Sequence, residues 1–387
     1  MKSVRFGIIG CGLMGREFAS AAARWCHLPA MQVRPQIVAV CNTSPAPMRW
    51  FTAHFPDIRQ ATGDYRELLA NPDVDAVYVA VPHHLHAEIY CAAIRAGKHL
   101  LGEKPFGIDR EANAAILACL AEHPSCFARC SSEFPFFPAM QRIGKMLETD
   151  SFGRIIEVNA AFQHSSDLDP AKPLNWKRRT ATNGEYGCMG DLGMHTLHVP
   201  LRAGWSLRNV RAILTKIHAQ RPAADGTPSP CETWDNATLL CEAAAAGNPF
   251  PLTIRTQRIA PGEKNSWSFE ITGTRRSARF TTKQANTLQL LDYTGGEQAW
   301  QHLDMGHEMT FPTITGGIFE AGFSDIFLQM WAAYLVEMEQ GAPPARFAGC
   351  VTPEETRLHH HVLTAALESH QSGQVAEIGN FSHAAGN

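Results

Sequence analysis

The sequence of 387 residues is poor in charge and has no long apolar run. Charged side chains make up 18% of it and the formal net charge is -3, which excludes the basic surface that nucleic acids or acidic membranes attract. No run of about 18 apolar residues occurs, so no segment is expected to span a membrane. Residues 1–5 lead directly into a strand-like run and leave no room for the apolar part of a signal peptide. We therefore expect a cytoplasmic protein without a nucleic-acid or membrane partner.

Cysteine and histidine are present but lack the spacing of a disulfide framework or a metal site. None of the 11 cysteines forms a C-x-x-C pair, which is typical of a protein that keeps free thiols. The 18 histidines include the run His359, His360 and His361, but consecutive residues of a helix point in different directions. Because a metal site needs several converging ligands, we predict no metal.

The N-terminus contains a strand, a glycine turn and a helix in immediate succession. The apolar run Val4–Ile9 precedes the pattern G-x-G-x-x-G, and a helix-forming stretch follows it. In this context Gly10 allows the tight turn, Gly12 the close approach of a pyrophosphate, and Gly15 the packing of the helix on the strand. The pattern predicts a dinucleotide site at Gly10, Gly12, Leu13, Met14 and Gly15.

The end of the second strand, residues 36–42, bears on the choice between NAD and NADP. A dinucleotide fold usually has an acidic residue there to hold the ribose hydroxyls, but this chain has Asn42. A neutral amide does not repel a 2′-phosphate, and Arg49 follows a short distance along the chain. Because no Arg or Lys follows Asn42 directly, we favour NAD and keep NADP as the alternative. The residues expected near the ribose are Asn42, Thr43 and Ser44.

Further apolar runs, at residues 74–81, 98–101 and 125–130, alternate with helical segments. They predict a Rossmann-type, doubly wound parallel sheet of six strands over residues 1–130, whose ligands bind outside the carboxyl ends of the strands. Lys104 lies at such an end, on a loop stiffened by Pro105. Together with Lys104, the residues at these ends that we expect to bind the cofactor are Pro82, His83, His86 and Glu103.

Residues 131–387 differ in pattern and predict an α+β domain on a large, mostly antiparallel open sheet, because short hairpin-like connections separate the strands. A last helix, at about 352–372, begins with Thr352 as N-cap and Pro353 as its first residue, and we expect it to pack back on the first domain. The predicted strands are residues 154–164, 210–218, 238–242, 252–259, 266–272, 278–282 and 287–292.

The second domain contains two candidate substrate features. Asp191 and His195 are four residues apart and share one face of a helix, although such pairs are often simple surface contacts. The loop at residues 174–179 combines Trp176 with three consecutive cations. An arginine fork such as that of Arg178 holds a carboxylate, phosphate or sulfonate bidentately, so an anionic sugar is one expectation and a solvated loop is the alternative.

Taken together, Gly10-x-Gly12-x-x-Gly15, Glu103-Lys104-Pro105 and Asp191-x-Gly193-x-His195 resemble the motifs of the Gfo/Idh/MocA family of NAD(P)-dependent oxidoreductases. The resemblance covers nearly the whole chain. It implies that Lys104 is the catalytic lysine and that Asp191 and His195 face the nicotinamide. It also implies a homodimer or homotetramer that uses an open sheet face. His198 stands where family members often have Asp, which leaves the substrate contacts open.

The expected reaction is hydride transfer between the cofactor and a secondary hydroxyl of a sugar, polyol or sugar derivative. Oxidation also needs a base for the hydroxyl proton, and the sequence leaves His195 and Lys104 open for this role, with Asp191 orienting the histidine or binding a hydroxyl. Two alternatives use the same motifs: an NAD-dependent redox glycosidase, for example on a sulfosugar or uronate, and a non-catalytic cofactor-sensing regulator. The predicted substrate contacts are Lys104, Trp176, Arg178, Asp191 and His195.

Overall fold

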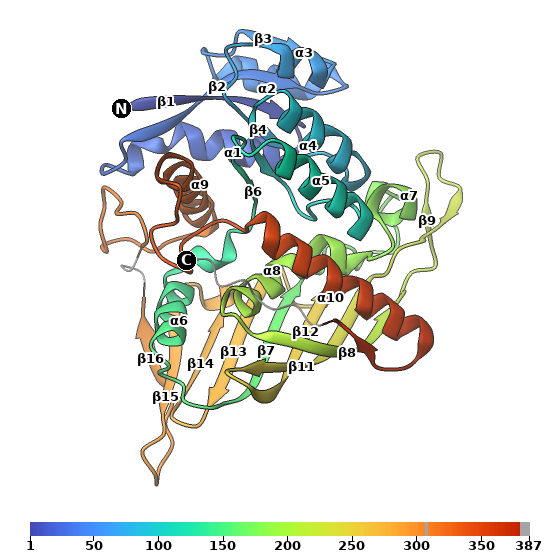
Figure 1. The fold of residues 1–387 in the computed structure, drawn as a ribbon. Coiled ribbons are helices and arrows are strands. Elements are labelled where there is room, and N and C mark those ends of the chain that lie inside the picture. Colours follow the sequence, from blue (N-terminus) through green and yellow to red (C-terminus); the bar gives the residue numbers. More distant parts are fainter. Residues whose placement is uncertain (306–308, 380–387) are drawn as a thin grey trace. The chain divides into compact units, whose positions relative to one another are not determined.

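Figure 1 shows the computed structural model of the chain, in which residues 1–305 and 309–379 are described. Contacts divide the chain into two units. The first contains Met1–Phe136 and Met309–Thr356, and the second contains the described part of Phe137–Glu308 and Arg357–Asn387. The segment 309–356 thus returns to the first unit, which the predicted boundary at residue 130 did not include.

The first unit is built on a parallel sheet of six strands, the number predicted, although the apolar runs located only five of them. Its strand order is β3-β2-β1-β4-β5-β6, so the order reverses between β1 and β4. The pairs are parallel throughout. Strand β3 has no apolar run of its own, which is why periodicity did not reveal it. The strands are β1 (Lys2–Ile9), β2 (Val33–Cys41), β3 (Gln60–Thr62), β4 (Ala76–Val79), β5 (His99–Gly102) and β6 (Ala128–Cys130).

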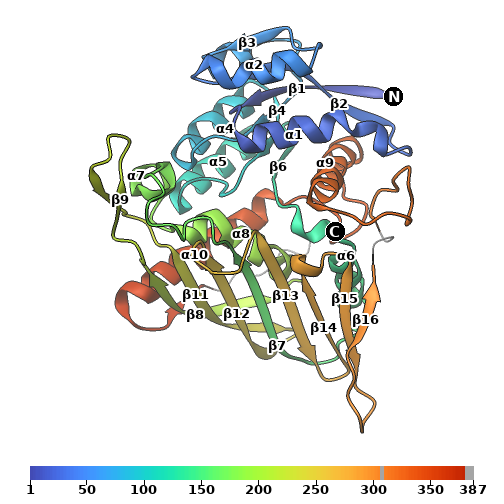
Figure 2. The same cartoon turned by 180° about the vertical axis from the view of Figure 1, so that it is seen from behind.

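Helices cover both faces of this sheet. In Figures 1 and 2, α4 and α5 lie together on one face, while α1 and α9 lie on the other. Asp109 caps α5, because its side chain accepts a 2.8 Å hydrogen bond from the Ala112 N–H. The helices of this unit are α1 (Leu13–Ala23), α2 (Pro45–His54), α3 (Tyr65–Ala70), α4 (His86–Arg95), α5 (Arg110–Glu122) and α9 (Phe323–Gln340).

Helix α9 joins the first unit through aromatic residues and a buried ion pair. The ring centroid of Trp331 lies 3.5 Å from that of Phe18 and 5.5 Å from that of Phe6. Glu337, whose side chain is 1% exposed, accepts a 2.7 Å hydrogen bond from Arg129 Nε on β6. Because these contacts bury α9 against β1, β6 and α1, the segment around it belongs to this unit.

The second unit contains the large open sheet that the short connections predicted. Its nine strands have the order β16-β15-β14-β13-β7-β12-β11-β8-β17. Strands β7 and β12 are parallel and the other pairs are antiparallel, so the predicted fold class is confirmed. A small separate sheet pairs β9 with β10. The strands are β7 (Ile155–Gln163), β8 (Ser206–Thr215), β9 (Gln220–Pro222), β10 (Pro228–Pro230), β11 (Asn236–Ala245), β12 (Asn248–Gln257), β13 (Ser266–Gly273), β14 (Arg276–Thr281), β15 (Thr287–Asp292), β16 (Gln301–Asp304) and β17 (Ala376–Glu377).

Helices α8 and α10 lie on one side of that sheet, in front of it in Figure 1 and behind it in Figure 2. Thr352 caps α10 as predicted: its hydroxyl accepts a hydrogen bond from the Glu355 N–H, and the Glu355 carboxylate accepts one from the Thr352 N–H. Only the first turn of α10 belongs to the first unit, so its packing on that domain stays a prediction. The α-helices here are α6 (Pro138–Glu148), α7 (Thr180–Asn183), α8 (Cys188–Arg202) and α10 (Pro353–Ser372), and the chain's 3-10 turns are Trp25–His27, His83–Leu85, Phe134–Phe136, Trp176–Arg178 and Thr282–Gln284.

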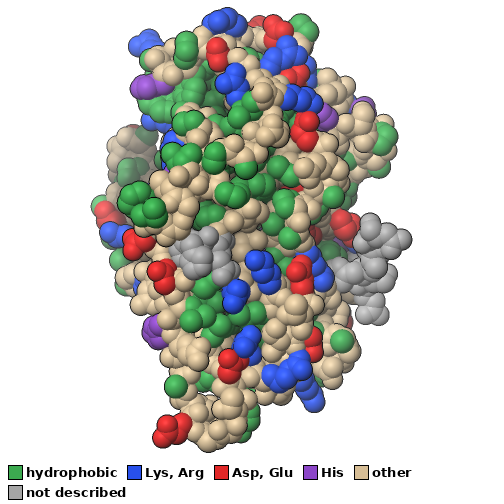
Figure 3. Space-filling view, turned by 90° about the vertical axis from the view of Figure 1, so that its left-hand side faces the viewer, with side chains coloured by type: hydrophobic (Ala, Val, Ile, Leu, Met, Phe, Trp, Pro, Cys, Tyr) green, Lys and Arg blue, Asp and Glu red, His purple; other side chains and the backbone are tan. Residues whose placement is uncertain are grey.

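The surface carries charges of both signs. On the face shown in Figure 3, the Lys and Arg side chains are interspersed with Asp and Glu. Neither sign dominates this face, in agreement with the net charge of -3. Within the described residues, no helix combines the length and the apolar character needed to cross a membrane.

Candidate functional site

The glycine turn between β1 and α1 has the geometry that its three glycines predicted. Gly10 has a φ of +102°, and a Cβ there would lie 2.2 Å from the Ala80 carbonyl oxygen. A Cβ on Gly15 would lie 2.2 Å from the Gly10 carbonyl oxygen, so only glycine lets α1 pack this closely. A Cβ on Gly12 would meet nothing within 4 Å, which leaves open space at the start of α1. The predicted contacts Leu13 and Met14 follow in α1, exposed and half-buried respectively.

Asn42 connects the glycine turn to the end of β2. Its Oδ1 accepts a 3.1 Å hydrogen bond from the Cys11 N–H, and its Nδ2 donates a 3.0 Å hydrogen bond to the Ser44 carbonyl. Thr43 and Ser44 are exposed beside it. Since both ends of the amide have protein partners, Asn42 shapes the loop, a role that the sequence did not predict.

The loop after β5 carries Lys104 and is fixed by the residue before it. Glu103 is buried, and its Oε1 accepts hydrogen bonds from the hydroxyls of Tyr78 at 2.7 Å and Ser131 at 2.6 Å. The Tyr90 hydroxyl donates a 2.7 Å hydrogen bond to the Glu103 carbonyl. Residues from β4, α4 and the segment after β6 therefore hold this loop, from which the half-buried Lys104 projects.

His86 ties the same loop to the end of β4. Its Nδ1 lies 2.6 Å from the Pro105 carbonyl oxygen and its Nε2 lies 2.9 Å from that of Val81, while its ring stacks on Tyr90. Burial lowers the pKa of His86 to about 4, although both carbonyls raise it, so the ring is neutral at pH 7. Because the side chain has no exposed surface, its observed role is to position the loop. The neighbouring predicted contacts Pro82 and His83 are half-buried and buried, respectively.

Asp191 and His195 lie one turn apart on α8 and are not a solvated surface pair. They are 5% and 3% exposed, respectively. Both carboxylate oxygens of Asp191 accept 3.1 Å hydrogen bonds from Lys177 Nζ, and Oδ2 also pairs with Arg258. The His195 ring lies edge-on to Phe162, with centroids 5.2 Å apart. The carboxylate is thus oriented by two cations, one turn before the imidazole on the same helix.

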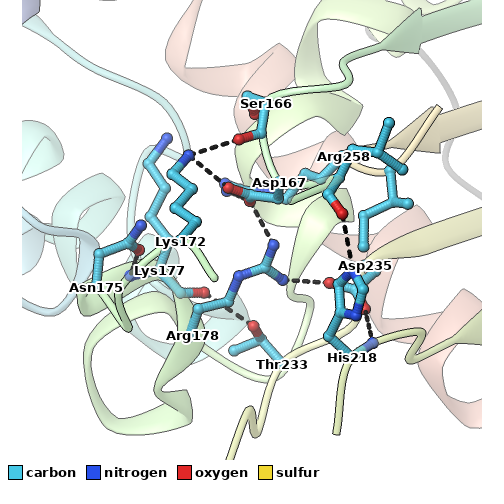
Figure 4. A network of polar contacts seen from close by, with 12 residues as sticks. Ser166, Asp167, Lys172, Asn175, Lys177, Arg178, His218, Thr233, Asp235 and Arg258 are labelled. Atoms are coloured by element: carbon cyan, nitrogen blue, oxygen red, sulfur yellow. Dashed lines mark hydrogen bonds and ion pairs between the residues drawn. The ribbon is translucent and has the colours of Figure 1, made fainter. Parts of the chain in front are cut away.

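Arg178 lies inside the second unit, and not on a solvated loop. Its side chain is 1% exposed and forms ion pairs with Asp167 and Asp235 (Figure 4). Asp167 also pairs with Lys172 at 2.7 Å and with Arg258 at 3.3 Å. Burial raises the pKa of Asp167, but these cations outweigh it and lower the pKa to about 2. The predicted anion clamp is therefore corrected, because carboxylates of the same unit occupy the guanidinium of Arg178.

Trp176 and Lys177 are half-buried next to Arg178. The Lys177 Nζ, which contacts Asp191, lies 5.5 Å from the centroid of the Trp176 ring. The Lys177 side chain is 33% exposed, so this cation connects the buried network to the surface. In contrast, Arg179 is exposed.

Three polar residues of these sites were missed by sequence analysis. Lys177 stood in a run of three cations, and nothing local distinguished it from its neighbours. Arg258 directly follows β12 and is buried, which no spacing rule indicates. Glu133 follows β6 and is 6% exposed; its position beyond the carboxyl end of a strand is a signal that could have found it.

The described residues contain no group of three or more His, Cys, Asp or Glu that could hold a metal ion. Two members of the histidine run, His359 and His360, are each 2% exposed and lie inside α10. The run therefore belongs to the packing of this helix.

Two family models match the chain. Residues 4–129 match the model described as "Oxidoreductase family, NAD-binding Rossmann fold", and residues 140–279 match the "GFO/IDH/MocA C-terminal domain". The two matches together span more than half of the chain. The chain belongs to the Gfo/Idh/MocA oxidoreductase family. NAD is the cofactor of the Rossmann domain in this family, as the glycine pattern predicted.

Relatives of the chain include enzymes that are named for sugar compounds. The chain is 27% identical over 308 residues to levoglucosan dehydrogenase of Pseudarthrobacter phenanthrenivorans, covering 75% of this chain and 76% of that protein. It is 32% identical over 197 residues to dTDP-3,4-didehydro-2,6-dideoxy-alpha-D-glucose 3-reductase of Saccharopolyspora spinosa, covering 50% and 54%. The structure of levoglucosan dehydrogenase in complex with NADH has a TM-score of 0.85 at 22% identity and covers 98% of this chain and 100% of that chain, so the fold is shared.

Proposed function

We propose that this protein is an NAD-dependent dehydrogenase or reductase that acts on a secondary hydroxyl of an uncharged sugar or polyol. The observation that carries the proposal is the anchoring of the Lys104 loop. Glu103 holds it from one side through Tyr78 and Ser131, and His86 holds it from the other through the Pro105 carbonyl. A lysine so fixed at the carboxyl edge of a Rossmann sheet is placed for chemistry on a bound ligand.

The residues of the glycine turn fit NAD. The open space beside Gly12 suits a pyrophosphate, and the N-cap of α1 makes no side-chain hydrogen bond, so backbone N–H groups of the first turn are suited to phosphate oxygens. When bound, NAD supplies the acceptor for the hydride. The engagement of Asn42 with Cys11 and Ser44 makes its amide a support for this turn, and the exposed Thr43 and Ser44 are proposed to contact the ribose.

The chain's own residues have to handle the hydroxyl proton. Oxidation removes that proton while the hydride leaves the same carbon, and reduction returns it. We propose that Lys104, a half-buried cation, stabilises the developing alkoxide. His195 and Lys104 stay the two candidates for the proton acceptor, with Asp191 fixed by Lys177 and Arg258 to bind a hydroxyl of the substrate.

An uncharged substrate follows from the pairing of the cations near Asp191. Arg178 holds two carboxylates, and Lys177 contacts both oxygens of Asp191. An anionic sugar would have to compete with these existing pairs, whereas hydroxyl groups accept or donate hydrogen bonds without displacing them.

The test is a substrate panel read by two signals in parallel. Neutral sugars, 1,6-anhydro sugars, polyols, uronates and aryl glycosides are incubated with NAD or NADP, and both nicotinamide absorbance and aglycone release are followed. We expect NADH to accumulate in proportion to a ketone product of a neutral substrate. Aglycone release without accumulation of NADH would identify the redox glycosidase instead, and binding of NAD without any turnover would identify the regulator.

A pair of lysine variants ties that activity to the site. Lys104→Met should lower kcat about a hundredfold or more, because it removes charge stabilisation at the reacting atoms, while NADH binding by fluorescence stays intact. Lys145→Met, which changes an exposed lysine of α6, is the control and should leave kcat unchanged. Undiminished turnover in the Lys104 variant would refute the assignment.

The homodimer or homotetramer and the cytoplasmic location stay predictions. Light scattering would measure the oligomeric state.

A further inference from the structure

Glu133 lies beside the Lys104 loop although sequence analysis did not select it. Strands β5 and β6 pair in parallel, with Gly102 opposite Cys130. The pairing continues beyond the strands, because the Ser131 N–H donates a 3.0 Å hydrogen bond to the Gly102 carbonyl. Lys104 and Glu133 therefore follow at the same edge of the sheet, two and three residues past a paired position. Glu133 is 6% exposed, so its carboxyl group is withdrawn from water.

The environment of Glu133 contains charges of both signs within the first unit. The pKa of Glu133 is raised to about 7: burial is the largest cause, the charge of Glu103 also raises it, and its own backbone N–H and the charge of Lys104 lower it. The Glu133 charge in turn contributes to the raised pKa of Tyr78. The ionisable groups that act on Glu133 are Glu17 on α1, Tyr78 on β4, and Glu103 and Lys104 after β5.

We propose that Glu133 is a positioning residue whose carboxylate holds Lys104 in the ammonium form, an inference that rests on the role proposed above for Lys104. An interaction that favours one ionised partner favours the other equally, so the attraction seen at Glu133 also acts on the lysine. Glu103 is a second carboxylate at this edge, and its Oε1 accepts hydrogen bonds from Tyr78 and Ser131, so it anchors the loop in addition to carrying charge.

The consequence is a lysine whose charge depends on a second buried acid. Above neutral pH the Glu133 carboxylate is ionised and retains the proton of Lys104. As the pH falls, Glu133 takes up a proton and its support for the ammonium ends, although the bulk pH alone then keeps Lys104 charged. The support therefore matters on the alkaline side, where Lys104 would otherwise lose its proton at a lower pH.

The first experiment measures the coupling without turnover. The infrared carbonyl band of a protonated carboxyl group is followed from pH 5 to pH 9 in the wild-type protein and identified by its absence in Glu133→Gln. We expect a midpoint near the value of about 7, and we expect Lys104→Met to move it to higher pH. The same midpoint pH in the wild-type protein and in Lys104→Met would overturn the proposal. If Glu133→Gln does not fold, Glu133→Asp identifies the band by a shift in its frequency.

The second experiment is the pH profile of kcat/KM with the best neutral substrate. Glu133→Gln should move the alkaline limb of the profile, which reports the loss of the Lys104 proton, to lower pH by about one unit. Glu133→Asp keeps the charge and should return this limb to nearly its wild-type pH. Glu122→Gln, an exposed carboxylate at the end of α5, is the matched control and should leave the profile in place. An unmoved limb would overturn the inference while the dehydrogenase stands. Absent turnover with an intact infrared coupling would overturn the proposed function alone.

Discussion

Replacing Arg178 by Met separates a buried structural arginine from one that binds a substrate. Arg178 is 1% exposed and pairs with Asp167 and Asp235, which are 2% and 1% exposed. The variant keeps an unbranched apolar stem and removes the guanidinium with its charge. Asp167 retains Lys172 and Arg258, whereas Asp235 retains the backbone N–H groups of Ile217 and His218.

The size of the effect follows from the carboxylates. The pKa of Asp167 falls from 3.8 to about 2, and since each pKa unit is worth about 1.4 kcal/mol, the ionised carboxylate makes a net contribution of about 2 kcal/mol at pH 7, after the cost of its burial. Leaving Asp235 in a dry interior without its arginine adds to this loss. We therefore expect Arg178→Met to lower the free energy of unfolding by about 3 kcal/mol at pH 7, the usual cost of breaking a buried pair.

The sign of the pH dependence gives a second check. The folded-state pKa of Asp167 lies below its unfolded value of 3.8, so its contribution is present above pH 3.8 and is lost as the pH falls through about 2. The difference between wild type and Arg178→Met should therefore shrink when the pH is lowered from 7 to about 3, because the contribution of ionised Asp167 is then partly lost.

Urea unfolding followed by circular dichroism at both pH values measures these differences. The matched control is Arg179→Met, which changes the exposed neighbour in the same loop and should stay within about 0.5 kcal/mol of wild type. An Arg178→Met protein as stable as that control, with a raised KM for anionic sugars only, would refute the buried network and restore the anion clamp.

Three further predictions concern the other parts of the sites. Gly12→Ala should fold normally and bind NADH more weakly, because its Cβ enters space left for the ligand, whereas Gly15→Ala should lower the melting temperature, because its Cβ would lie 2.2 Å from the Gly10 carbonyl oxygen. Burial lowers the pKa of His86 from 6.5 to about 4, so the neutral ring contributes to stability above pH 6.5. The free energy of unfolding should fall by about 3 kcal/mol as the pH is lowered from 6.5 through 4. Urea titrations of His86→Gln at several pH values should lack this decrease. Lys177→Met should raise KM for the sugar in steady-state assays and leave NADH affinity unchanged, because Lys177 holds the Asp191 carboxylate that we propose binds a substrate hydroxyl. An unchanged KM would show that Lys177 does not support the substrate through Asp191.

The local sequence pattern was sufficient to predict structure where residues close together in the chain determine the backbone geometry. The glycine turn shows this, because the positive φ of Gly10, the close packing at Gly15 and the open space at Gly12 all follow from residues within one turn of chain. The caps Asp109 and Thr352 were predictable for the same reason, since each side chain bonds an N–H group three residues ahead. The spacing of Asp191 and His195 on one helix belongs to this group as well.

The partners of the charged side chains could not be predicted, because they come from distant parts of the sequence. Arg178 finds its carboxylates 11 residues before it and 57 residues after it, and only folding turns the guanidinium inward. The same holds for α9, because the rings of Phe6 and Phe18 on which Trp331 is buried come from the other end of the sequence.

The sequence by itself determined the fold class, the dinucleotide turn and the candidate lysine, because hydrophobic periodicity and backbone sterics act over a few residues. Only the tertiary structure decided which ionisable groups are exposed and which neutralise one another. Burial and charge pairing depend on residues that meet in space. This is why three consecutive cations differ in exposure in the folded protein: Arg178 is buried, Lys177 is half-buried and Arg179 is exposed.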